Sequence, residues 1–241
     1  YRLSDMKGGD PMENRGLLRA LWWAGVLLAG ALVLVASLSL GLGPQWLALL
    51  FALVGVGAVA AALVINALWL REVSRQVSAL YPILAEEKDP DRYIQSLNEL
   101  LKGKRSAFLR GIRCINLCAA FCQKGDWTAA KEALLEISWR RLRGLQRALY
   151  LANLAYVCFY LKEDREALET MRHNRAGLQK YRAQLGALAD VLAIFETAAN
   201  GEKKAAARLL AEARQDYQGE EACQDFDELE RRLGAAQTKE Q

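Results

Sequence analysis

Three cysteines at four-residue spacing, Cys114, Cys118 and Cys122, are the residues whose type and arrangement come closest to a chemical site. At this spacing their thiols lie on one face of a helix. A zinc site needs four ligands, and the sequence places no histidine or further cysteine beside these three. Because a free cysteine packs as a small hydrophobic side chain, we expect the thiols to fill a helix interface and predict no metal site.

The remaining titratable residues offer no catalytic arrangement. His173 is the only histidine, which excludes a centre built on paired histidines within one chain, and we expect it to place positive charge near a helix C-terminus. The acidic pairs Glu86–Glu87 and Glu220–Glu221 are typical of solvated charge runs. No phosphate-binding loop, dinucleotide-binding glycine motif, nucleophile elbow or zinc-protease motif is present. The sequence therefore predicts neither an enzyme nor a cofactor-binding protein.

Cysteine number and net charge limit the compartment and the partners. The chain has five cysteines, an odd number, and no pair spaced as C-x-x-C, which favours a reducing compartment over a disulfide framework. The formal net charge of +4 is small for 241 residues. We therefore expect no nucleic-acid partner.

The elements that must position these residues begin with an apolar block from Ala20 to Leu70, which contains no Asp, Glu, Lys, Arg or His. A Gly-Leu-Gly-Pro-Gln break at 41–45 divides the block into two runs, which we assign to helices at 20–42 and 46–70. A helix rises ~1.5 Å per residue, so about 20 residues cross the ~30 Å hydrocarbon layer. Both runs reach that length and are apolar on every face. This predicts a transmembrane hairpin rather than a buried hairpin in a soluble core.

Charged flanks give the predicted hairpin an orientation. Basic residues precede the first run and follow the second, whereas the loop between them carries no charge. The positive-inside rule then predicts a multi-pass protein of the cell (inner) membrane with both termini in the cytoplasm. The expected membrane-interface residues are Arg15, Arg19, Trp22, Trp23, Trp46, Trp69, Arg71 and Arg75.

Small residues recur at four-residue spacing in both apolar runs, which lets helix backbones approach closely. The pairs are Gly25/Ala29, Gly57/Ala61 and Ala58/Ala62. Their faces fit two arrangements, packing of the hairpin on itself and formation of a homo-oligomer, and the sequence leaves both open.

The N-terminal tail, residues 1–19, contains a methionine at Met12 that is typical of a natural start. The preceding residues 7–11 back-translate to a purine-rich ribosome-binding sequence. We therefore predict that residues 1–11 are an upstream in-frame reading of a bacterial gene rather than part of the native protein.

A connector, residues 71–89, joins the hairpin to the rest of the chain. We expect the second helix to continue past the apolar run and to end near Pro82, because proline breaks a helix. Asp89 followed by Pro90 is typical of a helix start, with Asp as the N-cap and Pro in the first turn. Residues 90–241 are therefore predicted to form one helical domain on the cytoplasmic side.

Helical periodicity continues to the end of the chain, and this domain contains an internal repeat. Each copy is typical of two antiparallel helices around a tight polar turn. The corresponding segments are 116–118 with 125–127 in the first copy, 153–155 with 162–164 in the second, and the turn at Gly201 in the third.

The pattern resembles the tetratricopeptide repeat (TPR), with copies spaced by 37 and 39 residues where that family uses ~34. The resemblance implies an all-α fold, in which the transmembrane hairpin is followed by a short α-solenoid of about three divergent helix-turn-helix repeats. Helices at 90–101 and 220–233 would flank the repeats, the second with an apolar side and an acidic side, as a solenoid cap requires. The residues expected to pack within the repeats are Leu117, Cys118, Phe121, Gly125, Ala130, Leu154, Ala155, Ala167, Gly201 and Ala206.

The resemblance also implies a concave groove, lined by the first helix of each pair, that binds a peptide. Asparagine amides can bond a peptide backbone, and aromatic rings add apolar contact area. The candidate groove residues are Asn116, Asn153, Tyr156, Tyr160 and Phe195. The alternative is that the aromatic side chains belong to the core.

Charge is uneven along the helical domain. Residues 102–147 carry 11 basic and three acidic residues, whereas residues 148–241 carry 13 basic and 16 acidic ones. Basic groups near anionic lipid contribute about 1 kcal/mol each. The basic half fits two interpretations, contact with anionic lipids of the inner leaflet and a solvated surface.

Two functions remain open from the sequence. In the first, the protein is a membrane-anchored adaptor or scaffold, which presents the TPR-like domain to the cytoplasm and binds a protein or peptide partner. In the second, it is a small accessory subunit of a membrane transporter or channel complex, and the hairpin is the functional part.

Overall fold

The computed structural model describes residues 13–41, 43–103, 106–217 and 220–237, with the exception of the side chains of residues 13–21, 220–223 and 235–237. Every regular element in these ranges is a helix, so the predicted all-α class is confirmed. The chain divides into two compact units, Tyr1–Gln76 and Val77–Gln241. The prediction about residues 1–11 falls outside the described residues.

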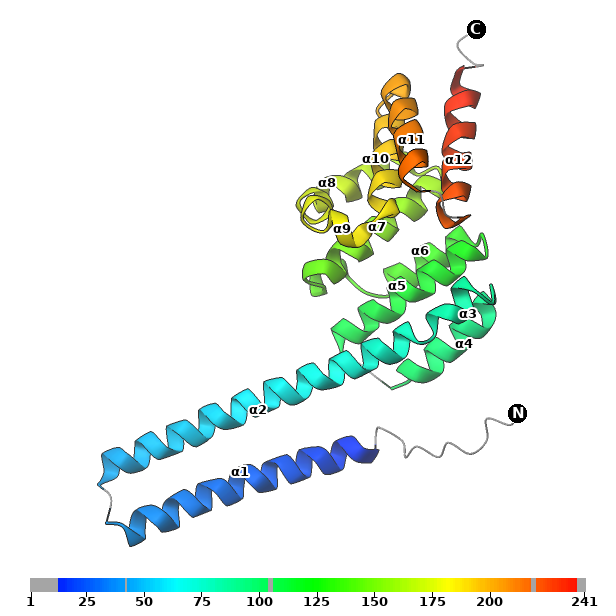
Figure 1. Cartoon of the computed structure of the whole chain (residues 1–241). Coiled ribbons are helices and arrows are strands. Elements are labelled where there is room, and N and C mark those ends of the chain that lie inside the picture. Colours follow the sequence, from blue (N-terminus) through cyan, green and yellow to red (C-terminus); the bar gives the residue numbers. More distant parts are fainter. Residues whose placement is uncertain (1–12, 42, 104–105, 218–219, 238–241) are drawn as a thin grey trace. The chain divides into compact units, whose positions relative to one another are not determined.

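The first unit contains α1 (Glu13–Ser39) and most of α2 (Pro44–Ser78), both long and apolar enough to cross a membrane (Figure 1). Only 6% of the apolar stretch of α1 and 0% of that of α2 is buried, whereas a core helix of a soluble protein buries most of its residues. Leu27 is 71% exposed and Leu63 is 66% exposed, although water would favour covering both. A hydrocarbon environment fits this exposure.

The two serines of α1 bond within their own helix. The Ser37 hydroxyl donates to the Leu34 carbonyl at 2.8 Å, and the Ser39 hydroxyl donates to the Val35 carbonyl at 2.9 Å. A helix that satisfies its hydroxyls internally needs no water along this stretch.

The predicted interface tryptophans lie in the first half of α1, at the start of α2 and in the second half of α2. Trp22 and Trp23 contact each other edge to face at 4.9 Å between ring centroids. Trp23 and Trp46 are exposed, and Trp69 is half-buried. Arg71 is exposed, and Arg75 donates to the Glu72 carboxylate on the same helix at 3.1 Å. The side chains of Arg15 and Arg19 lie outside the described residues.

Helix α2 continues beyond the apolar run and ends at Ser78, as predicted, because Pro82 follows within one turn. Pro82 instead lies in the first turn of the short helix α3 (Tyr81–Ala85). Helix α4 spans Pro90–Leu101, and the Asp89 carboxylate accepts the backbone N–H of Arg92 at 3.0 Å. The predicted helix start at Asp89–Pro90 is therefore confirmed.

Three pairs of consecutive helices form most of the second unit (Figure 1). Helix α7 is central, because it packs against α5, α6, α8 and α10. Short helices η1 and α9 connect the pairs, and α12 ends the chain against α10 and α11. The bounds are α5 Ala107–Gln123 with α6 Trp127–Leu135, α7 Gly144–Tyr160 with α8 Asp164–Lys180, α10 Ala187–Ala199 with α11 Lys203–Asp216, η1 Trp139–Arg141, α9 Arg182–Leu185 and α12 Glu220–Gln237.

The turns between the paired helices share one backbone conformation. A residue of positive φ follows the first helix in each pair: Gly125 at 73°, Lys162 at 62° and Gly201 at 86°. In each turn the next residue donates its backbone N–H to the carbonyl five positions earlier, a Schellman arrangement. The internal repeat in the sequence therefore has a counterpart in local backbone structure.

The fourth residue of each second helix is an alanine. Ala130, Ala167 and Ala206 have 0% of their surface exposed. A larger side chain would separate the paired helices or strain them. The other predicted packing residues lie as follows: Leu117, Cys118, Leu154 and Ala155 are buried, Phe121 is half-buried, and Gly125 and Gly201 occupy turns.

Candidate functional site: an aromatic groove

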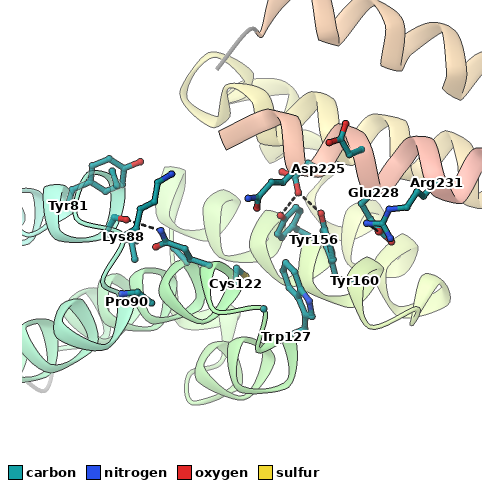
Figure 2. A pocket seen from close by; sticks show the side chains of 17 residues that line it. Tyr81, Lys88, Pro90, Cys122, Trp127, Tyr156, Tyr160, Asp225, Glu228 and Arg231 are labelled. Atoms are coloured by element: carbon teal, nitrogen blue, oxygen red, sulfur yellow. Dashed lines mark hydrogen bonds and ion pairs between the residues drawn. The ribbon is translucent and has the colours of Figure 1, made fainter. Parts of the chain in front are cut away.

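A cavity of about 1010 Å³ lies in the second unit, and we call it the groove (Figure 2). Its walls come from α3 and the segment that leads to α4, the ends of α5 and α7, the start of α6 and the middle of α12. Segments far apart in the sequence thus meet around one opening.

Three aromatic rings form one wall of the groove. The Trp127 ring stacks on Tyr160 at 3.9 Å between centroids and 15° between planes, and it meets Tyr156 edge to face at 5.9 Å. Tyr156 and Tyr160 share a face of α7 because they are four residues apart. Trp127 opens α6, whose start is fixed by Asp126, since that carboxylate accepts the Ala129 N–H at 2.9 Å.

A carboxylate from the last helix meets these rings. Asp225 Oδ1 accepts hydrogen bonds from the Tyr156 and Tyr160 hydroxyls, both at 2.5 Å (Figure 2). Among the described residues, no donor bonds to Asp225 Oδ2. The groove therefore combines three half-buried aromatic rings with a half-buried carboxylate that keeps one oxygen for a further donor.

The environment shifts the pKa of all three hydrogen-bonded groups upward. Burial raises the pKa of the Asp225 carboxyl, and the two tyrosine hydrogen bonds oppose this only in part. Burial, together with the nearby Asp225 charge, raises the pKa of Tyr156 and of Tyr160. Both phenols therefore keep their protons at neutral pH and act as donors.

Helix α12 is fixed in place by an apolar side and by Arg232. Phe226 and Leu229 are fully buried and Leu233 is 8% exposed, so the predicted apolar side of this helix is confirmed. Arg232 donates to the Phe159 carbonyl at 2.7 Å and to Glu228 at 3.0 Å. These contacts hold Asp225 over the tyrosines.

Two of the five residues predicted for a groove lie in its wall, Tyr156 and Tyr160. Asn116 uses its amide elsewhere, since Oδ1 accepts the Tyr93 hydroxyl at 2.7 Å and Nδ2 donates to the Ile112 carbonyl. Asn153 Nδ2 donates to the Leu149 carbonyl on its own helix.

Phe195 lies behind the groove. It is 2% exposed, stacks on Phe159 at 4.8 Å between ring centroids, and lines a separate cavity of about 120 Å³. The groove residues that sequence reasoning missed are Trp127 and Asp225. The acidic side of the predicted helix at 220–233 was a signal for Asp225, but nothing local indicated its tyrosine partners.

The cysteines on α5 pack as small apolar side chains. Cys114 and Cys118 are buried, and Cys122 is half-buried beside the groove with its sulfur 3.9 Å from that of Cys118. Burial raises the pKa of Cys114 to about 11, which keeps the thiol protonated and unreactive.

A second cluster, Cys158 with Glu163 and Glu166, has the donor atoms of a metal site within 4.8 Å of one another. The Lys131 ammonium already bonds both carboxylates, at 2.6 and 2.8 Å. Burial alone would lower the pKa of Lys131, but the two carboxylates outweigh it and raise that pKa. Lys131 thus supplies the positive charge that this acidic pair requires.

The expected place of His173 at a helix C-terminus is wrong. Helix α8 continues to Lys180, since no glycine in a turn or proline stops it earlier, and His173 lies in its interior. Its Nδ1 lies 2.9 Å from the Glu169 carbonyl oxygen, and its ring lies 6.2 Å from that of Trp139.

Comparison of the chain with protein-family models, with curated proteins and with solved structures finds no match. Aromatic faces beside a carboxylate oxygen attract a cation, such as the ammonium of lysine or the guanidinium of arginine.

Proposed function

We propose that the protein is a membrane-anchored adaptor. In this proposal α1 and α2 form a hairpin that spans the cell membrane twice, and both termini lie in the cytoplasm. The exposed apolar surface of both helices supports the anchor, and the basic flanks of an uncharged loop support the orientation. The odd number of cysteines and the burial of Cys114, Cys118 and Cys158 fit a reducing compartment.

The helical pairs of residues 90–241 form a TPR-like domain in this proposal, and its groove binds a protein partner. Repeated turns and buried alanines support the repeat architecture. The single observation that carries the binding function is the packing of Trp127 against two tyrosines that bond to Asp225, inside an open cavity.

The partner segment presents a lysine or arginine side chain to this groove. The ring faces can attract its charge, and Asp225 Oδ2 can accept one of its N–H groups. A cation over an aromatic face contributes about 0.5–2 kcal/mol, more when water is excluded. Because Tyr156 and Tyr160 already hold the carboxylate in place, binding costs little conformational entropy.

A peptide-library experiment tests the proposal. The full chain in lipid nanodiscs is titrated with short peptides that carry Lys, Arg, Ala or Glu at one central position. We expect Lys and Arg peptides to bind and to lose affinity with Trp127→Ala or Asp225→Asn. Asp216→Asn, which removes an exposed carboxylate outside the groove wall, is the matched control. Equal binding of Ala and Lys peptides would contradict the proposal.

The membrane topology has its own test. A reporter that is active only in the cytoplasm, fused after Gln241, should be active, and one inserted between the apolar runs should be silent. The reverse pattern would exclude the proposed orientation.

A further inference from the structure

Several arginines of the second unit face carboxylates, but a group around η1 does not. Arg113, Arg182 and Arg214 form ion pairs with Glu136, Asp190 and Asp227, respectively. Within the described residues, four arginines in one eight-residue stretch have no carboxylate partner. They are Arg140, Arg141, Arg143 and Arg147, and we call them, together with Trp139, the arginine–Trp139 surface.

Two of these arginines lie near the Trp139 ring. The Arg147 guanidinium lies 4.3 Å from the centroid of its ring, and the Arg140 guanidinium lies 5.4 Å from it. Trp139 and Arg147 are half-buried, whereas Arg140, Arg141 and Arg143 are exposed. Two guanidinium groups are thus held near one ring, and the other two are exposed and have no carboxylate partner among the described side chains.

The chemistry of this surface favours phosphate groups. Four like charges in a short segment repel one another, and an anion that binds there relieves the repulsion. Each guanidinium presents a planar fork of donors that fits two phosphate oxygens at once. Leu135, which ends α6 four residues before Trp139, is 58% exposed and adds apolar surface next in the sequence.

We propose that the arginine–Trp139 surface binds the phosphate groups of anionic lipids and docks the second unit on the bilayer. The proposal rests on the membrane anchor proposed above. The apolar run of α2 ends at Leu70 and the second unit begins at Val77, so a few residues tether this unit to the bilayer. Tryptophan and arginine are suited to the interface, since each has an apolar body and a polar end.

Each arginine near an anionic bilayer contributes about 1 kcal/mol, or about fivefold in the docking equilibrium. Two of them together contribute ~30-fold. The double variant Arg143→Gln/Arg147→Gln removes two charges from the surface. The matched control, Arg165→Gln/Arg208→Gln, removes two charges from α8 and α11, outside this surface.

The test is amide hydrogen exchange of residues 138–147 in the full chain, in nanodiscs of phosphatidylcholine alone and of phosphatidylcholine with phosphatidylglycerol. We expect anionic lipid to slow this exchange at least fivefold, the surface variant to lose the slowing, and the control variant to keep it. Identical exchange in the two lipids, or equal loss in both variants, overturns the proposal.

Two further arms identify the source of the anion. Inorganic phosphate or a polyanion such as RNA or polyglutamate is added to discs that contain only phosphatidylcholine. Slowing there, without slowing by phosphatidylglycerol, assigns the surface to a soluble ligand and overturns lipid docking. A Lys peptide titrated in the same discs reports the groove separately, and failure of the chain to enter discs overturns the anchor and the docking together.

Discussion

Two tryptophans of the second unit lie in opposite electrostatic surroundings. Trp127 lies against tyrosines that bond to the Asp225 carboxylate, whereas Trp139 lies near the guanidinium groups of Arg140 and Arg147. An aromatic face attracts cations in both places, but at Trp139 the chain supplies the cation itself. The proposed role of the first site is therefore to receive a positive group from a partner, and that of the second is to present surplus positive charge to an anion.

The difference has a local origin in the sequence. Trp127 follows a glycine turn and an aspartate N-cap, so the ring starts a helix beside α7. Trp139 lies in a short 3-10 turn and is followed directly by Arg140 and Arg141. The same residue type thus lies beside a carboxylate-bonded tyrosine pair in one place and within a cationic surface in the other.

The largest expected effect separates the two tryptophans by function. Trp127→Ala removes the stacked ring and should weaken binding of a Lys peptide up to ~30-fold, the equivalent of a desolvated cation–π contact of ~2 kcal/mol. Trp139→Ala should leave that affinity unchanged. Isothermal titration of both variants in nanodiscs measures the contrast, with circular dichroism as the check on folding. A similar loss in both variants would mean that the two sites do not differ as argued.

Asp225→Asn should weaken Lys-peptide binding about tenfold, because the variant loses the charge that complements the ligand. The wild-type affinity should also depend on pH. A cationic ligand favours ionised Asp225, so affinity should rise as pH increases through its raised pKa. Subtracting the pH profile of Asp225→Asn from that of the wild-type chain separates the titration of Asp225 from that of the other carboxylates that line the groove. A pH dependence that survives in Asp225→Asn would assign it to another group.

The same raised pKa predicts a pH effect on stability. Because the folded state binds the Asp225 proton more tightly than the unfolded state, its contribution to stability is complete below the unfolded pKa and is lost as pH rises through the folded pKa. In urea unfolding over this pH range, the free energy of unfolding should decline less with rising pH for Asp225→Asn than for the wild-type chain. Parallel profiles of the two proteins would contradict this account.

Salt should act differently on the two sites. The Debye length falls from ~10 Å at 0.1 M to ~3 Å at 1 M salt, which screens exposed charges much more than half-buried ones. The slowing of exchange at residues 138–147 by anionic lipid should therefore disappear at high salt. Lys-peptide binding in the groove should weaken less, and the opposite order would contradict the difference in burial.

The smallest expected effects concern the turns that position the helices. Lys162 and Gly125 occupy the same left-handed conformation, which costs a non-glycine residue about 1 kcal/mol. Lys162→Gly should stabilise the protein by about 0.5–1 kcal/mol, and Gly125→Ala should destabilise it by about 1 kcal/mol. Chemical unfolding measures both changes in stability. Gly125→Ala should also weaken Lys-peptide binding in the groove, because Trp127 follows that turn.

Local patterns in the sequence predicted much of the fold. The apolar runs marked α1 and α2, Asp89–Pro90 marked the start of α4, and the repeat spacing located the turns at Gly125, Lys162 and Gly201. These features depend on neighbouring residues or on helical periodicity, so a single sequence contains them. The extension of α8 past His173 was missed because no capping signal marks where that helix ends.

The composition of the groove could be predicted only in part, because distant packing decides it. Tyr156 and Asp225 are 69 residues apart, and only the docking of α12 brings them together. Asn116 is taken by Tyr93, which comes 23 residues earlier in the chain. Phe195 is buried by Phe159 on another helix, and a helical pattern alone does not say which apolar face a neighbour covers.

The most direct test of the adaptor proposal is the removal of one charge from the ligand. A Lys peptide selected in the library experiment and the same peptide acetylated at that lysine are titrated against the full chain and against Asp225→Asn in nanodiscs. The groove predicts at least a tenfold loss on acetylation for the wild-type chain and little further loss for the variant. Equal affinity of the two peptides for the wild-type chain would contradict the proposed cation-binding groove.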